Sequence, residues 1–341
     1  MKKFSCWLTL VILILCQGSS VAQSGRHRRE SPPPSTAASE SDEAVRLSTT
    51  EVVVPVTVRN RYGRPIQGLT KSDFILYEDG RRQELTGFYA DSVAAHIVML
   101  IDVSGSVQTE IDNIRLAALS VITQLRPNDR VCIYQFNDTV RLLEDWTSDK
   151  LRLERALMNL PATGNTAFYN ALYEAALKLS QIDGRRTILL LTDGVDTYQG
   201  KHPKSAAEAF EAIQRAEASV YVISKTKALR EYLRGIRSPS IFRALDPRDL
   251  QIQWLLQALD ESERWLISLA ERTGGKIYFP VSQYDLTSVY NDIAQELNAQ
   301  YVLHYVPQNL NFDGRFRRIR VETSNPAYIA YAREGYYAVR R

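Results

Sequence analysis

Continuous apolar runs alternate with amphipathic stretches from about residue 93 to residue 300. Continuous runs are typical of strands that are covered on both faces, and four of them lie at 97–101, 130–136, 187–191 and 219–223. The amphipathic stretches between them predict helices near 108–125, 150–159, 167–181 and 204–217. This alternation predicts an α/β fold of the doubly wound kind, with a mostly parallel sheet and helices on both faces.

An insertion interrupts the alternation in the second half of this region. Residues 225–260 are rich in arginine and leucine and do not follow the strand–helix rhythm, so we expect one or two inserted helices there. After the insertion the pattern predicts a helix near 262–272, a strand at 276–279 and a helix near 284–299. We place the whole α/β domain, with its insertion, over residues 93–300.

Both flanks of this domain have a β-like pattern. Residues 45–92 contain β-branched and aromatic runs at 51–58 and 74–77, separated by turn residues. They predict a small β module that is too short to be strongly stable unless it packs on a neighbour. Residues 301–341 predict strands at 301–306, 317–322 and 328–333. We expect these carboxy-terminal strands to extend the sheet or to pair with the amino-terminal module.

The amino terminus has the features of a cleaved export signal over residues 1–22. Lys2 and Lys3 precede an apolar run from Phe4 to Cys16, and Ser20-Val21-Ala22 supplies the small residues that a signal peptidase reads. The run is too short for a comfortable membrane span, and no other stretch approaches one. We expect an exported protein that is periplasmic, cell-envelope associated or extracellular. A lipoprotein anchor at Cys16 is the alternative, although Leu15 is larger than such sites prefer.

Composition adds a linker and argues against some partners. Residues 23–44 are rich in Ser, Pro, Arg and Glu and predict a disordered linker. The formal net charge of +3 is close to balance, so the chain lacks the strong basic excess that is typical of nucleic-acid binding. Signal removal would leave Cys132 as the only cysteine. Because Cys132 lies in a strand-like run, we expect a small buried hydrophobic residue.

Three short segments place oxygen-bearing side chains at the ends of predicted elements. Asp102-Val103-Ser104-Gly105-Ser106 follows the strand at 97–101, and Leu191-Thr192-Asp193-Gly194 follows the strand that begins at Thr187. Gly164-Asn165-Thr166-Ala167 directly precedes a predicted helix. Loops at the carboxyl ends of parallel strands converge on one crevice. We therefore expect the three segments to meet at one edge of the sheet.

The side chains that would meet there are hard oxygen donors, namely the carboxylates of Asp102 and Asp193 and the hydroxyls of Ser104, Ser106 and Thr166. Such a set suits Mg²⁺, Mn²⁺ or Ca²⁺ and is poor for zinc or copper. With two charged ligands, one divalent cation keeps net positive charge and an open or water-filled position. A carboxylate from another protein can then complete the shell. We expect one Mg²⁺ (or Mn²⁺ or Ca²⁺) ion and a protein partner that offers a Glu or Asp.

The same residues resemble a known family of adhesion domains. The Asp-x-Ser-x-Ser run at 102–106, the later Thr166 and the later Asp193-Gly194 are similar to the metal-ion-dependent adhesion site of von Willebrand factor A and integrin I domains. The similarity covers roughly residues 95–300. The full layout resembles the acidobacterial VWFA-related family through the export signal, Leu69-Thr70, Asp73-Phe74, Glu78-Asp79-Gly80 and the closing Gly335-Tyr336-Tyr337.

The resemblance implies roles for the five residues. Ser104, Ser106 and Thr166 would be direct or near-direct ligands, while Asp102 and Asp193 would act largely through water. It also implies a shift of the helix near 284–299 when a partner carboxylate binds. The insertion at 225–260 is absent from the commonest domains of this kind, which leaves its role open.

Other interpretations of these residues remain. Asp102 to Ser106 can form a loop that caps the next helix, Thr166 can cap the helix that follows it, and Asp193-Gly194 can be a turn. Asp196 is either a second carboxylate near the ion or a solvated loop residue, and Asn137-Asp138 is typical of a hairpin turn.

Function classes other than adhesion also remain. A structural envelope protein, in which the metal only joins the loops, is the main alternative. A metal-dependent hydrolase is less favoured, because glycines do not flank Ser104 as in a nucleophile elbow and no phosphate-binding loop is present. We therefore expect that the protein is not an enzyme.

Overall fold

The computed structural model describes residues 51–90, 93–105, 111–158, 160–192, 194–236, 247–280 and 283–339. These residues belong to one compact unit, Ser48–Arg341. The expected signal at 1–22 and linker at 23–44 lie outside the described residues. Within the described ranges, no helix combines the length and the apolar character that crossing a bilayer requires.

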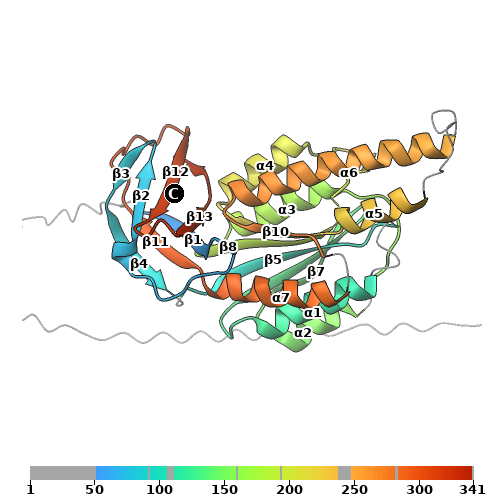
Figure 1. Ribbon diagram of the computed structural model, residues 1–341, viewed down its shortest axis with the longest axis horizontal. Coiled ribbons are helices and arrows are strands. Elements are labelled where there is room, and N and C mark those ends of the chain that lie inside the picture. The colour runs from blue at the N-terminus through green and yellow to red at the C-terminus, as the bar shows by residue number, and fades with distance from the viewer. Residues whose placement is uncertain are drawn as a thin grey trace, which may run out of the picture. The chain divides into compact units, whose positions relative to one another are not determined.

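A six-stranded sheet forms the centre of the α/β region (Figure 1). In spatial order its strands are β10 (Lys276–Tyr278), β9 (Ser219–Ser224), β8 (Arg185–Thr192), β5 (Ala95–Asp102), β6 (Arg130–Phe136) and β7 (Val140–Thr147). All neighbours pair in parallel except β6 and β7, which form an antiparallel hairpin. The predicted turn at Asn137-Asp138 lies between these two strands.

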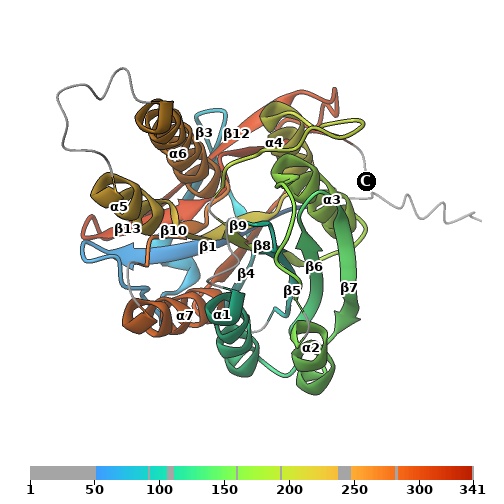
Figure 2. The same cartoon turned by 90° about the vertical axis from the view of Figure 1, so that its right-hand side faces the viewer.

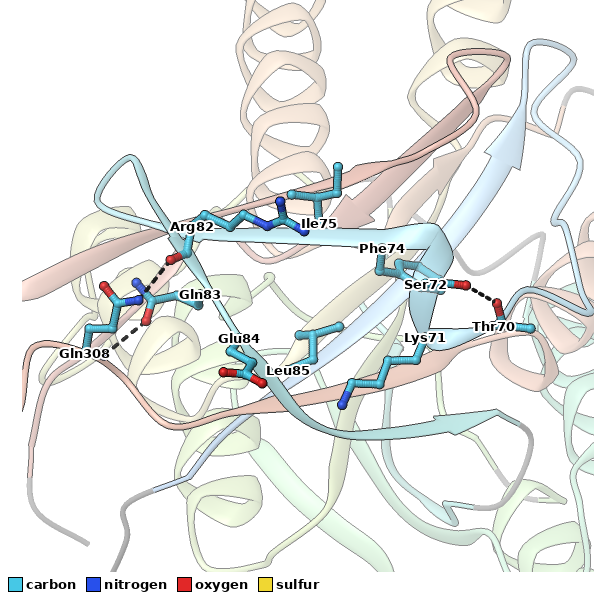
Figure 3. Close-up of a pocket in the computed structure, with 10 residues that line it drawn as sticks. All are labelled: Thr70, Lys71, Ser72, Phe74, Ile75, Arg82, Gln83, Glu84, Leu85 and Gln308. Carbon is cyan, nitrogen blue, oxygen red and sulfur yellow. Dashed lines mark hydrogen bonds between the residues drawn. The ribbon is translucent and has the colours of Figure 1, made fainter.

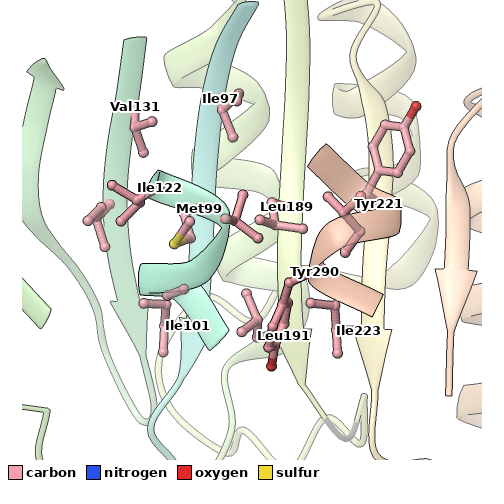
Figure 4. Packing of buried hydrophobic residues seen from close by; sticks show 14 of the residues in the cluster. Ile97, Met99, Ile101, Ile122, Val131, Leu189, Leu191, Tyr221, Ile223 and Tyr290 are labelled. Atoms are coloured by element: carbon pink, nitrogen blue, oxygen red, sulfur yellow. The ribbon is translucent and has the colours of Figure 1, made fainter. Parts of the chain in front are cut away.

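Helices cover both faces of this sheet (Figure 2). One face packs against α1 (Ile111–Gln124), α2 (Lys150–Leu157) and α7 (Gln283–Asn298), and the other packs against α3 (Phe168–Ser180), α4 (Ala206–Arg215) and α6 (Pro247–Arg272). Along β5, Ile97, Met99 and Ile101 face the first layer, which Figure 4 shows, whereas Val98 and Leu100 face the second. Burial on both faces explains why the strand is a continuous apolar run.

The insertion is helical, as expected, but its end differs from the predicted boundary. It consists of α5 (Thr226–Ile236) and the first half of α6, which packs on α5 through Leu233, Ile252 and Leu259. The helix expected near 262–272 is the second half of the same 26-residue helix. No glycine or proline follows Pro247 inside α6, so nothing in the backbone ends the helix near residue 260.

The two β-like flanks form a β sandwich together. One four-stranded sheet has the order β13-β1-β11-β4 and the other has the order β14-β12-β2-β3. The strands are β1 (Val52–Asn60), β2 (Phe74–Glu78), β3 (Arg81–Gln83), β4 (Leu85–Ala90), β11 (Tyr301–Tyr305), β12 (Phe316–Thr323), β13 (Tyr328–Ala332) and β14 (Gly335–Tyr337). A short 3-10 helix, η1 (Lys71–Asp73), precedes β2. Apolar side chains from both sheets share one core, so the carboxy-terminal strands pair with the amino-terminal module. The predicted fold class is confirmed.

Polar contacts join this sandwich to the amino-terminal ends of the parallel strands. Glu217, two residues before β9, forms an ion pair of 2.9 Å with Arg333. The Tyr221 hydroxyl accepts a hydrogen bond from Gln300 Nε2 at 3.1 Å, and Arg272 at the end of α6 pairs with Glu334. The sandwich therefore lies at the amino edge of the six-stranded sheet. The carboxyl edge is formed by loops, and it is this edge that carries the predicted site.

Candidate functional site

Asp102 ends β5 and is fully buried at the carboxyl edge of the sheet. Its Oδ1 accepts hydrogen bonds from the backbone N–H of Ser104 at 2.9 Å and from the Ser104 hydroxyl at 2.6 Å. Its Oδ2 accepts one from the Thr192 hydroxyl at 2.8 Å. Since Thr192 ends β8, the carboxylate joins the ends of two neighbouring strands. Three donors therefore hold the carboxylate in one orientation.

Backbone hydrogen bonds join the three predicted loops to one another. Gly105 N–H donates to the Gly164 carbonyl at 3.0 Å, and Thr163 N–H donates to the Val103 carbonyl at 2.9 Å. Thr197 N–H, in the loop after β8, donates to the Thr166 carbonyl at 3.1 Å. With the Asp102–Thr192 contact, each loop is bonded to both others. The predicted convergence of the loops is thus present in the fold.

Thr166 is buried beside these contacts, but it does not cap the helix that follows. The N-cap residue of α3 is Ala167, which provides no side-chain cap. Instead, Asp196 Oδ2 from the loop after β8 accepts a hydrogen bond from the backbone N–H of Tyr169 at 3.0 Å. Among the described residues, the Thr166 hydroxyl has no hydrogen-bond partner, while its backbone N–H donates to Thr197 Oγ1 at 2.9 Å. The capping interpretation of Thr166 is therefore wrong.

Two of the five predicted residues, Ser106 and Asp193, lie outside the described residues. The structure adds Thr192, which orients Asp102, and Asp196, which is partly buried and caps α3. No sequence signal marked Thr192, because a threonine at the end of a strand usually serves as an ordinary β-branched residue. The sequence alone does not reveal the role of Asp196, because this role depends on a helix that begins 28 residues earlier in the chain.

The described donors fit a hard cation in their chemistry. Asp102, Ser104 and Thr166 supply carboxylate and hydroxyl oxygens, and all three are nearly inaccessible to solvent in the folded chain. Oxygen donors of this kind suit Mg²⁺, Mn²⁺ and Ca²⁺. Within the described ranges, no cluster of three or more His, Cys, Asp or Glu side chains is arranged to hold a metal. A site here would thus depend on hydroxyl ligands more than on acidic ones.

A separate pocket of about 860 Å³ lies on the β sandwich (Figure 3). Its charged lining residues are Lys71, Arg82 and Glu84. Its remaining lining residues are Thr70, Ser72, Phe74, Ile75, Gln83, Leu85 and Gln308. Gln308 donates a hydrogen bond to the Arg82 carbonyl at 3.1 Å, within the sandwich. The pocket therefore belongs to the sandwich and not to the predicted cation site.

A comparison with known protein families finds a match over the segment that carries the three loops. Residues 97–195 match the family model of the von Willebrand factor type A domain. The α/β region is von Willebrand factor A-like. This match runs from within β5 to just past the end of β8, so it includes all five predicted ligand positions.

Several solved structures are similar to the chain at low identity. A von Willebrand factor type A protein from Catenulispora acidiphila has 14% identity and a TM-score of 0.45, with 80% of this chain and 65% of that chain covered. The PilB minor pilin from Streptococcus sanguinis has 14% identity and a TM-score of 0.44, with 64% and 63% covered. The conserved hypothetical protein BatB from Bacteroides thetaiotaomicron has 16% identity and a TM-score of 0.40, with 60% and 100% covered. The chain thus spans less than two thirds of the length of the first two.

Proposed function

We propose that this von Willebrand factor A-like domain is an exported protein-binding module. It binds one divalent cation, Mg²⁺ or a similar ion, at the carboxyl edge of its sheet. The cation in turn coordinates a Glu or Asp carboxylate of a partner protein. The ligands are Asp102, Ser104, Ser106, Thr166 and Asp193, of which the hydroxyls bind directly and the two aspartates act largely through water.

One observation carries this proposal, namely the mutual hydrogen bonding of the three loops around the buried Asp102 carboxylate. Burying a carboxylate is costly, and the three hydrogen bonds to Asp102 come from hydroxyl and backbone N–H groups. The Thr166 hydroxyl is not consumed by helix capping, since Asp196 caps α3 in its place. A divalent ion would place positive charge beside the Asp102 carboxylate and would give the Thr166 hydroxyl a partner.

Calorimetric titration with Mg²⁺ and Mn²⁺ tests the site. Asp102→Asn and Thr166→Val keep the shape of each side chain but remove a charge or a ligand, so each should weaken cation binding by roughly 100-fold. Asp129→Asn is the matched control. Asp129 is also buried, but its carboxylate accepts hydrogen bonds from Ala95 and Arg126 N–H near the amino ends of the same strands. This variant should bind the cation as the wild type does.

Thermal unfolding in chelator shows whether each variant is folded, so that loss of binding can be assigned to the site. Unchanged titrations for both Asp102→Asn and Thr166→Val in folded protein would exclude these residues as ligands. If the cation binds and raises the Tm but glutamate-bearing peptides are not retained, the metal only joins the loops. In that case the structural-envelope alternative replaces adhesion.

A further inference from the structure

Helix α6 extends beyond the carboxyl edge of the sheet, next to the proposed cation site. It leads into β10, which is parallel to its neighbours, so the helix runs from the carboxyl edge towards the amino edge. Ser262 lies level with the carboxyl edge, because its hydroxyl donates a hydrogen bond of 2.6 Å to the carbonyl of Gly194, two residues after the end of β8. Residues 247–261 lie before it and correspond to about 22 Å of helix at 1.5 Å per residue. Figure 1 shows this part of α6 extending past the ends of the strands.

The position of Trp265 identifies the side of α6 that faces the site. Its ring lies 5.6 Å from the ring of Phe168 and 5.2 Å from that of Tyr169, at the start of α3. Trp254 lies eleven residues earlier, which is about 20° away around the helix and about 16 Å along it. Trp254 therefore projects from the same side of α6 that overlooks the Thr166 loop, three turns further out.

Two large apolar side chains are exposed on this projecting part. Trp254 is 63% exposed and Leu250, one turn before it, is 50% exposed. The packing face of α6 is a different one, since Leu259 and Ile252 contact α5 in the apolar cluster that also includes Val195 of the loop after β8. Isolated exposed apolar residues are common on proteins. Here, however, they are neighbours one turn apart on a helix that stands beside the site.

We propose that Leu250 and Trp254 form a wall that binds an apolar side chain of the same partner whose carboxylate reaches the cation. This inference rests on the proposed function and adds the chemistry of the partner. Trp254 lies about 12 Å along α6 from Ser262, and Ser262 bonds Gly194, the residue after the proposed ligand Asp193. An extended peptide spans that distance in about four residues. The recognised segment is therefore an acidic residue with a large apolar residue about four positions away.

Short synthetic peptides test the wall directly. Each consists of glycine and serine with one glutamate, and carries either leucine or serine four positions from the glutamate, on either side. In millimolar Mg²⁺, one leucine arrangement should bind at least about tenfold more tightly than its serine counterpart, as expected for burying one leucine. Trp254→Ala and Leu250→Ser should remove this difference, whereas Trp254→Phe should keep most of it. Tyr62→Ala is the control, because Tyr62 is 72% exposed on the sandwich.

The outcomes separate this inference from the proposed function. If the glutamate peptides bind in Mg²⁺ but leucine and serine bind equally, the wall is excluded while the cation site stands. If no peptide binds in Mg²⁺ and the wild type takes up no cation, the proposed function itself is excluded. If sedimentation shows a dimer that Trp254→Ala converts to a monomer, a second copy of the chain covers this face. That result also overturns the inference.

Discussion

Tyr290 carries its hydroxyl into the apolar layer between α7 and the sheet. The residue is 4% exposed, and its hydroxyl has no hydrogen-bond partner among the described residues. Figure 4 shows the ring beside Leu191 and Ile223. Burial raises the pKa of Tyr290, as expected where an ionised phenol cannot be solvated. A buried donor without a partner costs about 1–3 kcal/mol.

Tyr290→Phe should therefore increase the free energy of unfolding by about 1 kcal/mol, as measured by denaturant titration. The matched variant is Tyr305→Phe in the sandwich. Tyr305 donates a hydrogen bond of 2.6 Å to the buried carboxylate of Glu78, so its loss should destabilise the protein. If Tyr290→Phe proves less stable than the wild type, the hydroxyl has a partner that the fold does not reveal.

Cys132 should be unreactive in the folded protein. It is fully buried in β6, as the sequence predicted, and burial raises the pKa of its thiol to about 12. Above pH 8, for as long as the protein stays folded, the native thiol remains protonated. An unfolded cysteine is mostly ionised above a pH of about 8.5. Alkylation at pH 9 should thus be very slow until denaturant is added. Rapid labelling of native protein would show that this strand opens.

The residues of the site differ in how far sequence alone could predict them. The position of Asp102 and Ser104 at the carboxyl end of a buried strand was predictable, because a continuous apolar run ends just before them. Thr192 and Asp196 were not assigned, because their roles come from contacts with β5 and α3, which are distant in the sequence. Local patterns do not encode such partners.

Helix α7 and strand β1 are joined by a buried ion pair. Arg59 donates to both carboxylate oxygens of Glu296, with Nε–Oε1 at 2.7 Å and Nη2–Oε2 at 2.8 Å. The side chains are 5% and 0% exposed. Removing Arg59 leaves Glu296 with only the more distant Lys276, at 3.3 Å, as a cationic partner, whereas replacing both members of a buried pair by apolar residues often restores stability.

Arg59→Met should consequently destabilise the protein by about 3 kcal/mol. The double variant Arg59→Met/Glu296→Leu should recover most of that loss in the same denaturant titration. Equal stability of the single variant and the wild type would show that this contact does not hold the sandwich against α7.

The contact between α6 and the site loop depends on Gly194. Its φ of +77° favours glycine, and an added Cβ would lie 2.4 Å from Ser262 Oγ. Gly63 has a similar φ of +76° but open space around the Cβ position. Both alanine variants incur the backbone strain of about 1–3 kcal/mol, and only Gly194→Ala must also displace side chains of α6, those of Ser262 and Leu266. Its Tm should therefore fall further than that of Gly63→Ala. An equal decrease in Tm for the two variants would mean that α6 accommodates the added methyl group at no cost.

Elements with one dominant pattern were predicted well, and the others were not. The buried strands β5, β6, β8 and β9 appear close to their predicted ranges because burial on both faces gives continuous apolar runs. Strand β7 was missed because it is an edge strand whose exposed positions alternate irregularly with buried ones. The length of α6 was missed because its two halves pack against different neighbours, α5 and the sheet, and so present different apolar faces.

At the scale of the whole molecule, the two edges of the parallel sheet have different surroundings. The β sandwich occupies the amino edge through ion pairs and hydrogen bonds such as Arg333–Glu217. The loops at the carboxyl edge are joined to one another and bordered by α6. A strand of eight residues, such as β5, spans about 26 Å between the two edges. Partner binding at one edge is thus compatible with a fixed sandwich at the other.

Anomalous diffraction from crystals soaked in Mn²⁺ tests the central claim most directly. The account predicts one strong peak at the carboxyl edge, about 2.1 Å from the hydroxyl oxygens of Ser104 and Thr166, with Asp102 oriented towards it by Thr192. Crystals of Asp102→Asn grown in the same way should lose the peak. An empty carboxyl edge in wild-type crystals at millimolar Mn²⁺, or a peak bound by other residues, would contradict the account.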